Sequence, residues 1–172
     1  MADENGKVEK LKRACGHAFV IYGHSCSHAV WYVISQYEPS QKWMAANDLI
    51  TNLSTSPKWK PVDQRELSML ASQGVLIVGG LNKVPAHGHV LVVYPGPQKS
   101  AGGYNAKDDA GKIYKVQPRG SYPLAMSTSS GGWPGARSYG DKTVWDSWGK
   151  DTEFKKVRFW KYVGSGTAGG NV

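Results

Sequence analysis

The sequence contains little cysteine and no long apolar segment. Its two cysteines, Cys15 and Cys26, allow one disulfide at most, and that bridge would consume both thiols. No stretch approaches the roughly 18 consecutive apolar residues of a membrane-spanning helix, so we expect no membrane span. Residues 1–7 are polar and lack the apolar region of a secretory signal peptide. If the protein acts outside the cytoplasm, we therefore expect another machine to carry it there.

Acidic residues are also few. The 13 Asp and Glu residues are outnumbered by 21 Lys and Arg residues, and the net charge of +8 favours an anionic partner. The basic residues follow no nucleic-acid-binding motif, so we expect no nucleic-acid partner. A solvated basic surface without a dedicated ligand is the alternative. The basic residues are scattered over segments 7–13, 58–65, 107–115 and 150–161.

The length and composition indicate a globular protein with many loops. A chain of 172 residues with 40% hydrophobic residues and seven tryptophans is long enough for one domain with a substantial core. The 21 glycines and nine prolines, many of them between residues 79 and 140, predict loops there. We expect a single domain over residues 1–163 and a flexible glycine-rich tail over residues 164–172.

Cys26 lies where an apolar helical pattern begins. Glycine and polar residues occupy positions 23–25, and apolar residues then recur with helical spacing from Val30 to Tyr37. The unpaired N–H groups of a first helical turn and a nearby imidazole both favour the thiolate that acts as a nucleophile. Cys26 is therefore a candidate nucleophile. The alternative is an inert buried cysteine.

His89 lies where a buried strand is predicted to begin. The run from Val90 to Tyr94 is β-branched and aromatic, and Gly88 permits a close approach of backbone or substrate. A histidine held rigidly at such a place can serve as a general base for a thiol across a cleft. Taken singly, His89 would more often be an ordinary core or surface histidine. Its combination with Cys26 makes it a candidate.

Two other uses of the cysteines stay open. His17, His24 and His28 surround Cys26 in the sequence, but they lack the paired ligand spacing of known zinc motifs. A stable Cys15–Cys26 disulfide would argue against a catalytic thiol. We expect neither a metal nor a cofactor.

The order of these segments resembles that of the papain-like NlpC-type cell-wall peptidases, most closely the type VI secretion amidase effectors. A Cys-Ser helix start is followed by a Gly-His-Val strand in both. The resemblance covers about residues 12–148. It includes the segments 74–81 (GVLIVGGL), 88–93 (GHVLVV), Gly96-Pro97 and Tyr122-Pro123.

The resemblance implies an antibacterial toxin. It would be a cysteine amidase or endopeptidase that hydrolyses peptidoglycan stem peptides, with the bond between D-glutamate and diaminopimelate as the expected target. The alternatives are an N-acetylmuramoyl-L-alanine amidase or another papain-like acyl hydrolase or transferase. An alternative of a different class is a non-enzymatic basic binding module with Cys26 in its core.

The same resemblance implies a location and partners. The protein would be made in the cytoplasm, secreted without a signal peptide, and active as a monomer in the periplasm of a target bacterium. Besides the stem peptides, its partners would be a cognate immunity protein and a carrier component of the type VI secretion system.

The pattern of apolar residues predicts an α+β scaffold. The resemblance implies the papain-like NlpC-type fold, with N-terminal helices packed on a central antiparallel sheet and a cleft between the layers. An extended connector is expected over residues 57–62 and an exposed hairpin tip or lid over 98–112. Helices are predicted over residues 7–22, 26–37, 45–53 and 63–73, and strands over 75–78, 89–94, 113–117, 143–145 and 156–162.

A third group should orient His89, and the sequence does not single it out. The candidates are Asp108, Asp109 or Asn105 in the hairpin segment, Ser127, or a backbone carbonyl. Three tryptophans lie among glycines in a region that could wall the cleft, although aromatic residues are more often part of a core. These are Trp133, Trp145 and Trp148.

Overall fold

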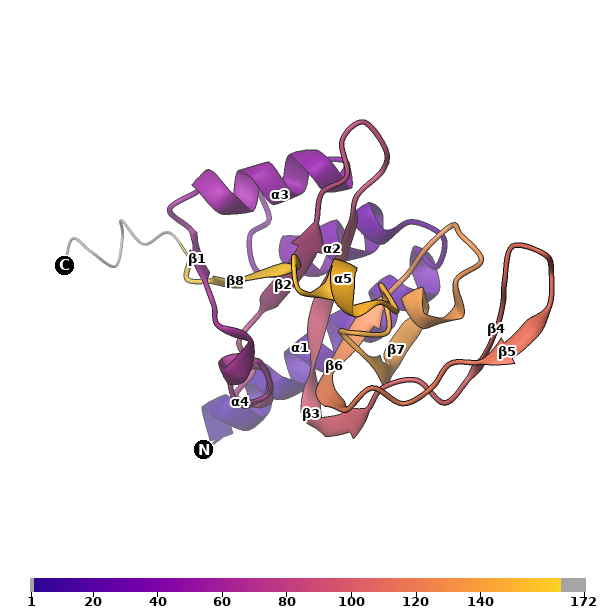
Figure 1. Cartoon of the computed structure of the whole chain (residues 1–172). Helices are drawn as coiled ribbons and strands as arrows, with labels where there is room; N and C mark the ends of the chain where they lie inside the picture. The colour runs from indigo at the N-terminus through magenta and orange to yellow at the C-terminus, as the bar shows by residue number, and fades with distance from the viewer. Residues whose placement is uncertain (1, 165–172) are drawn as a thin grey trace.

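A computed structural model of the chain describes residues 2–164 (Figure 1). The predicted glycine-rich tail lies, from residue 165 onward, outside the described residues. The architecture is α+β with a mostly antiparallel central sheet, as expected from the sequence. No helix among the described residues is long and apolar enough to cross a membrane.

The central sheet has six strands, and every neighbouring pair is antiparallel. The expected pairing of the two strands that flank residues 82–88 is confirmed, with Leu81 opposite His89. A separate two-stranded hairpin is formed by β4 (Asn105–Lys107) and β5 (Ile113–Lys115). The order across the sheet is β1 (Trp59–Pro61), β8 (Arg158–Tyr162), β2 (Ile77–Leu81), β3 (His89–Ser100), β6 (Ser121–Ser127) and β7 (Ser138–Thr143).

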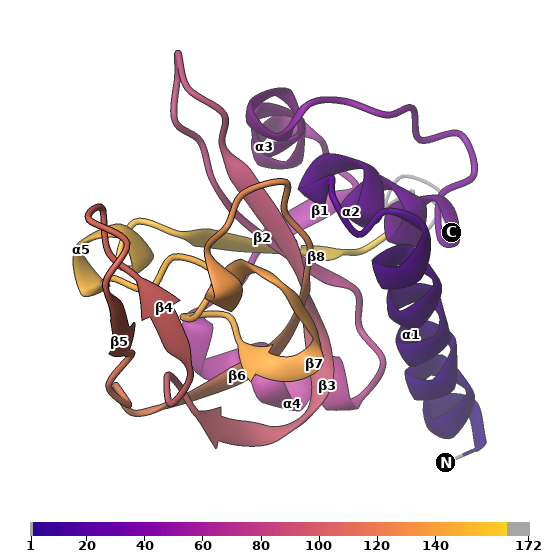
Figure 2. The same cartoon turned by 90° about the vertical axis from the view of Figure 1, so that its right-hand side faces the viewer.

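Helices cover one face of this sheet. The three N-terminal helices α1 (Ala2–Ile21), α2 (Cys26–Ser35) and α3 (Ala46–Thr55) lie on that face (Figures 1 and 2). The short helices α4 (Leu67–Ser72) and α5 (Asp151–Phe154) contribute to the core on the opposite face.

β2 and the first half of β3 are buried on both faces, which explains their continuous apolar sequences. Successive side chains of a strand point to opposite faces. Val90 and Val92 accordingly pack toward α1–α3, whereas Leu91 and Val93 pack in the other core. β3 is the long central strand of this arrangement and runs between the two layers (Figure 2).

The N-terminal helices agree with the sequence pattern. On α1, the predicted apolar side is confirmed by four buried residues, Leu11, Ala14, Cys15 and Ala18. The helix itself begins earlier than expected, at Ala2. The segment 63–73 forms a 3-10 turn (Gln64–Glu66) that leads into α4, and Asp63 caps the turn by accepting from the amide of Arg65.

Several strand assignments differ from the prediction. No strand was predicted at β4 or β6, and β7 lies almost entirely before the strand predicted at 143–145. The connector at 57–62 contains β1, which pairs with β8 at the edge of the sheet, where Pro61 is tolerated. The strand predicted over 143–145 is wrong, because Thr143 ends β7 and the chain then turns. The turn is held by the carboxylate of Asp146, which accepts from the amide and the hydroxyl of Thr143 at 2.9 Å each.

Candidate active site

Cys26 is the first residue of α2, as the sequence pattern predicts. The preceding Ser25 is the N-cap, and its hydroxyl oxygen accepts from the amide of His28 at 3.3 Å. The first amides of a helix have no partner within the helix. The thiol is partly exposed and lies beside the amides of Cys26 and Ser27.

His89 is the first residue of β3 and pairs with Leu81 of β2. On the other side of β3, the pairing with β6 begins at Val92. The imidazole Nε2 is 2.9 Å from the hydroxyl oxygen of Ser127, the last residue of β6. The strands on both sides of β3 therefore fix the place of the ring.

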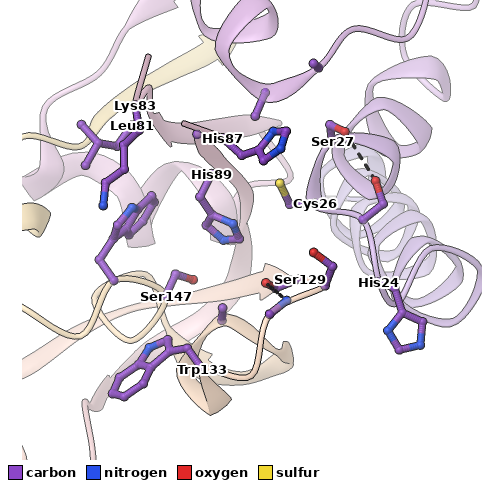
Figure 3. A pocket seen from close by; sticks show the side chains of 18 of the residues that line it. His24, Cys26, Ser27, Leu81, Lys83, His87, His89, Ser129, Trp133 and Ser147 are labelled. Atoms are coloured by element: carbon purple, nitrogen blue, oxygen red, sulfur yellow. Dashed lines mark hydrogen bonds between the residues drawn. The ribbon is translucent and has the colours of Figure 1, made fainter. Parts of the chain in front are cut away.

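The two residues meet in one open cavity of about 590 Å³. In Figure 3 the thiol of Cys26 lies in this cavity beside two imidazole rings, those of His87 and His89. The backbone amide of Val90, next to His89, also donates a hydrogen bond to the thiol. The structure thus brings together the candidate nucleophile and the candidate base that were predicted from the sequence.

Burial disfavours the charged form of both Cys26 and His89. It raises the pKa of the Cys26 thiol, and the amides of Val90, Ser27 and Cys26 lower it by a smaller amount. Burial lowers the pKa of His89 to about 4. Removal from water disfavours both the thiolate and the imidazolium, so the resting pair is a neutral thiol and a neutral imidazole at neutral pH.

The structure shows which of the candidates for the group that orients His89 lies next to its ring. Ser127 contacts His89 directly, whereas Asp108 uses its carboxylate to hold its own turn by accepting from the amides of Ala110 and Lys112. Asn105 lines a different cavity, of about 580 Å³, between the β4–β5 hairpin and the 132–134 loop. The hairpin that was predicted as a lid contributes no residue to the cavity of Cys26 within the described chain.

Two tryptophans form a wall of the cavity. Trp148 packs edge-on against His89 with ring centroids 5.3 Å apart. The indole N–H of Trp133 donates to the carbonyl of Asp146 at 2.7 Å, which fixes the ring at the cavity edge. Trp145, the third tryptophan of this region, is buried in the core with only 1% of its surface exposed.

The buried carboxylate of Asp146 organises this wall, a role not predicted from the sequence. One oxygen accepts from the amide of Gly102 and from the hydroxyl of Tyr104, both at 2.8 Å. The other accepts from Thr143. Only the surrounding Gly and Trp residues in the sequence mark the segment as unusual.

An aromatic stack supports the opposite side of the cavity. The ring of His28 lies between Tyr22 and Trp43, with centroid distances of 5.5 and 4.6 Å. Trp43 donates to the hydroxyl of Ser27 at 3.2 Å and lines the cavity next to Cys26. His28 is thus occupied in packing and in a 2.8 Å contact between its Nδ1 and Ser25.

Neither alternative use of the cysteines is seen. Both cysteines are free, and Cys15 is buried in the helical core, where burial raises its pKa. Among residues 2–164, no three His, Cys, Asp or Glu side chains are grouped as metal ligands would be.

Lys83 is the one lysine or arginine among the described residues that line the cavity, and none of these residues is Asp or Glu. Lys83 pairs with Glu153 at 2.6 Å, outside the lining.

The site combines a thiol at the start of a helix with an imidazole that contacts the hydroxyl of Ser127. Nucleophilic attack on an acyl carbon, assisted by proton transfer to the imidazole, is chemistry that such an arrangement is able to perform. No protein-family model matches this sequence, and no curated protein is significantly similar to it.

Proposed function

We propose that the protein is a cysteine amidase or endopeptidase that hydrolyses an amide bond in peptidoglycan stem peptides. The observation that carries the acyl-transfer chemistry is the meeting of Cys26 and His89 in one open cavity. The choice of peptidoglycan comes from the resemblance of the motifs around these residues to the NlpC-type amidase effectors. The papain-like fold, the antibacterial role and the bond between D-glutamate and diaminopimelate are part of the same proposal.

The first half of the reaction acylates the enzyme. His89 takes the proton of the Cys26 thiol, and the sulfur attacks the carbonyl carbon of the scissile amide. The oxyanion of the tetrahedral intermediate is stabilised by the amides of Cys26 and Ser27 at the start of α2. As the C–N bond breaks, the protonated His89 gives its proton to the departing amine, which leaves a thioester on Cys26.

The second half restores the enzyme. His89 takes a proton from water, the resulting hydroxide attacks the thioester carbonyl, and the C–S bond breaks. The products are the new carboxylic acid and the free thiol once the imidazolium returns its proton. The walls of Trp133 and Trp148 limit the access of bulk water on one side of the cavity.

The basic lining supports a carboxylate-bearing substrate. Peptidoglycan stems carry free carboxylates, and the described residues of the cavity include Lys83 but no acidic side chain. Electrostatic complementarity of this kind mainly raises the rate of encounter and the selectivity.

Mass spectrometry of purified stem peptides, incubated with the wild-type protein and with Cys26→Ala, tests the proposal. We expect the wild type to release fragments that identify one amide bond and Cys26→Ala to release none. Intact peptides in both samples would contradict the peptidoglycan proposal. Cleavage at the lactyl amide instead would identify the muramoyl-alanine amidase alternative.

A further inference from the structure

The hydroxyl of Ser127 has only one proton, and its surroundings determine where that proton goes. Ser127 is 1% exposed, and its hydroxyl donates to the carbonyl of Ala136 at 2.7 Å. A carbonyl oxygen can only accept, so the proton of Ser127 is committed to this bond.

Ser147 makes a second hydrogen bond to the Ser127 oxygen. Its hydroxyl donates to that of Ser127 at 3.1 Å, and Ser147 is 7% exposed. The contact that remains on the Ser127 oxygen, at 2.9 Å, is with Nε2 of His89. Because the Ser127 proton is already used, Nε2 must be the donor in this contact.

We infer that Ser127 is the positioning residue of the site, which holds His89 in the tautomer with the proton on Nε2 and the free lone pair on Nδ1. The inference rests on the proposed cysteine chemistry only for its effect on rate. Nδ1 is then the atom that receives the thiol proton. The hydroxyl takes the place in which a carboxylate or amide side chain commonly orients a catalytic histidine.

A neutral positioning group has a consequence for the resting state. A carboxylate behind the imidazole would stabilise the imidazolium, whereas a hydroxyl that is already donating to a carbonyl adds no charge. Among the described residues, the hydroxyl of Ser127 and the indole of Trp148 contact the His89 ring, and both are uncharged. The titratable or charged groups that share the cavity with it are the Cys26 thiol, His24, His87 and Lys83, and Lys83 is paired with Glu153. The burial of His89 acts in the same direction and favours the neutral ring.

His87 offers an internal comparison. Its ring also lies beside the Cys26 thiol, but it is exposed in the loop between β2 and β3. No hydrogen bond to its ring is present within the described chain. The hydroxyl pair behind His89 therefore distinguishes the base from its neighbour.

Nitrogen-15 NMR of the histidine side chains tests the inference without any need for activity. In the wild type at pH 7 we expect His89, assigned with His89→Gln, to show a protonated Nε2 and an unprotonated Nδ1. A protonated Nδ1 would overturn the inference whether or not the protein cleaves peptidoglycan. In Ser127→Ala we expect the signals to shift toward a mixture of the two tautomers.

Kinetics supply the second readout. Ser127→Ala should lower kcat by about tenfold to a hundredfold with little change in KM, as expected for loss of an orienting hydrogen bond. The matched control is Ser138→Ala, which removes another buried serine that donates to a backbone carbonyl, that of Ala125 at 2.6 Å. Equal losses of kcat in both variants, with an unchanged His89 tautomer, would reduce Ser127 to a structural residue and contradict the inference.

Discussion

Arg137 is hydrogen-bonded to the carbonyl of Gly23, a residue 114 positions earlier in the chain. The same guanidinium donates to the carbonyl of Ser129 at 2.6 Å and contacts Nδ1 of His24 at 3.2 Å. One side chain thereby joins the loop before Cys26 to the loop that follows β6. Both loops line the cavity, so their separation is set by this arginine.

Arg137→Lys should loosen this connection while keeping the charge. A lysine has no planar fork and cannot reproduce three contacts in one geometry. We expect a decrease in kcat of about tenfold and a loss of about 1–2 kcal/mol in the free energy of unfolding. Steady-state kinetics and urea denaturation would measure the two effects. Arg119→Lys, at an exposed position, is the control and should change neither quantity.

The variants His89→Ala and His87→Ala distinguish the roles of the two histidines beside the thiol. Because only His89 is held by Ser127, its replacement should reduce peptide cleavage by roughly 10³-fold or more, and that of His87 by less than about tenfold. Circular dichroism should show an unchanged fold in both variants. A larger loss in His87→Ala would assign the base to His87 instead.

The two cysteines should differ in their reaction with iodoacetamide. Cys26 is partly exposed and faces the cavity, whereas Cys15 has no exposed surface. We expect only Cys26 to be labelled in the folded protein, as located by peptide mass spectrometry. Because burial raises its pKa, the rate of labelling should still be increasing above pH 8.5. A rate that is already constant between pH 6 and 7 would instead show a resting thiolate.

The partly buried His89 should make the fold sensitive to mild acid. An unfolded histidine titrates near pH 6.5, whereas the pKa of His89 in the fold is about 4, so the unfolded chain takes up the proton first as the pH falls. The free energy of unfolding should be unaffected by this group above about pH 6.5, decrease below it, and level off below about pH 4, with a total loss of at most about 3 kcal/mol.

Urea denaturation at several pH values would measure this loss, with His89→Gln as the reference. Both proteins share the titration of all other groups, so the difference between them isolates His89. If the free energies of unfolding of the two proteins changed in parallel between pH 7 and 4, the assignment of a depressed pKa to His89 would be contradicted.

Gly149→Ala should disturb the tryptophan wall. Gly149 has a φ of +69°, and a β-carbon there would lie 2.3 Å from Cζ2 of Trp133. We expect a loss of about 1–3 kcal/mol in the free energy of unfolding and a higher KM. Gly132→Ala is the matched control, because a β-carbon at that position meets no atom within 4 Å. Similar losses in the two variants would argue against the role of Gly149.

The parts of the site that follow from local pattern could be predicted. Cys26 follows polar capping residues and precedes a helical apolar face, and His89 precedes a β-branched run, so each is marked by its own neighbours in the sequence. Their meeting in one cavity depends on the packing of α2 against β3, for which the sequence offered only a resemblance.

The remaining parts depend on contacts between distant segments. Ser127 was one of several third-group candidates, because its place beside His89 is set by the pairing of β6 with β3. Arg137 and Asp146 were not predicted, since their partners lie many positions away. The edge strand β1 was taken for a connector because Pro57 and Pro61 obscure a pairing with β8 near the other end of the chain.

The division of the reacting groups between α2 and the sheet means that neither portion of the chain can carry out the proposed reaction by itself. The segment before Pro57 supplies the thiol and its amides, and the segment after it supplies the imidazole and the serine hydroxyls. If the chain were divided between α3 and β1, each separately produced fragment would lack one of the two reacting side chains. Activity would return only when the fragments reassemble. Such a split pair would make complementation a direct assay of the docking of the helices on the sheet.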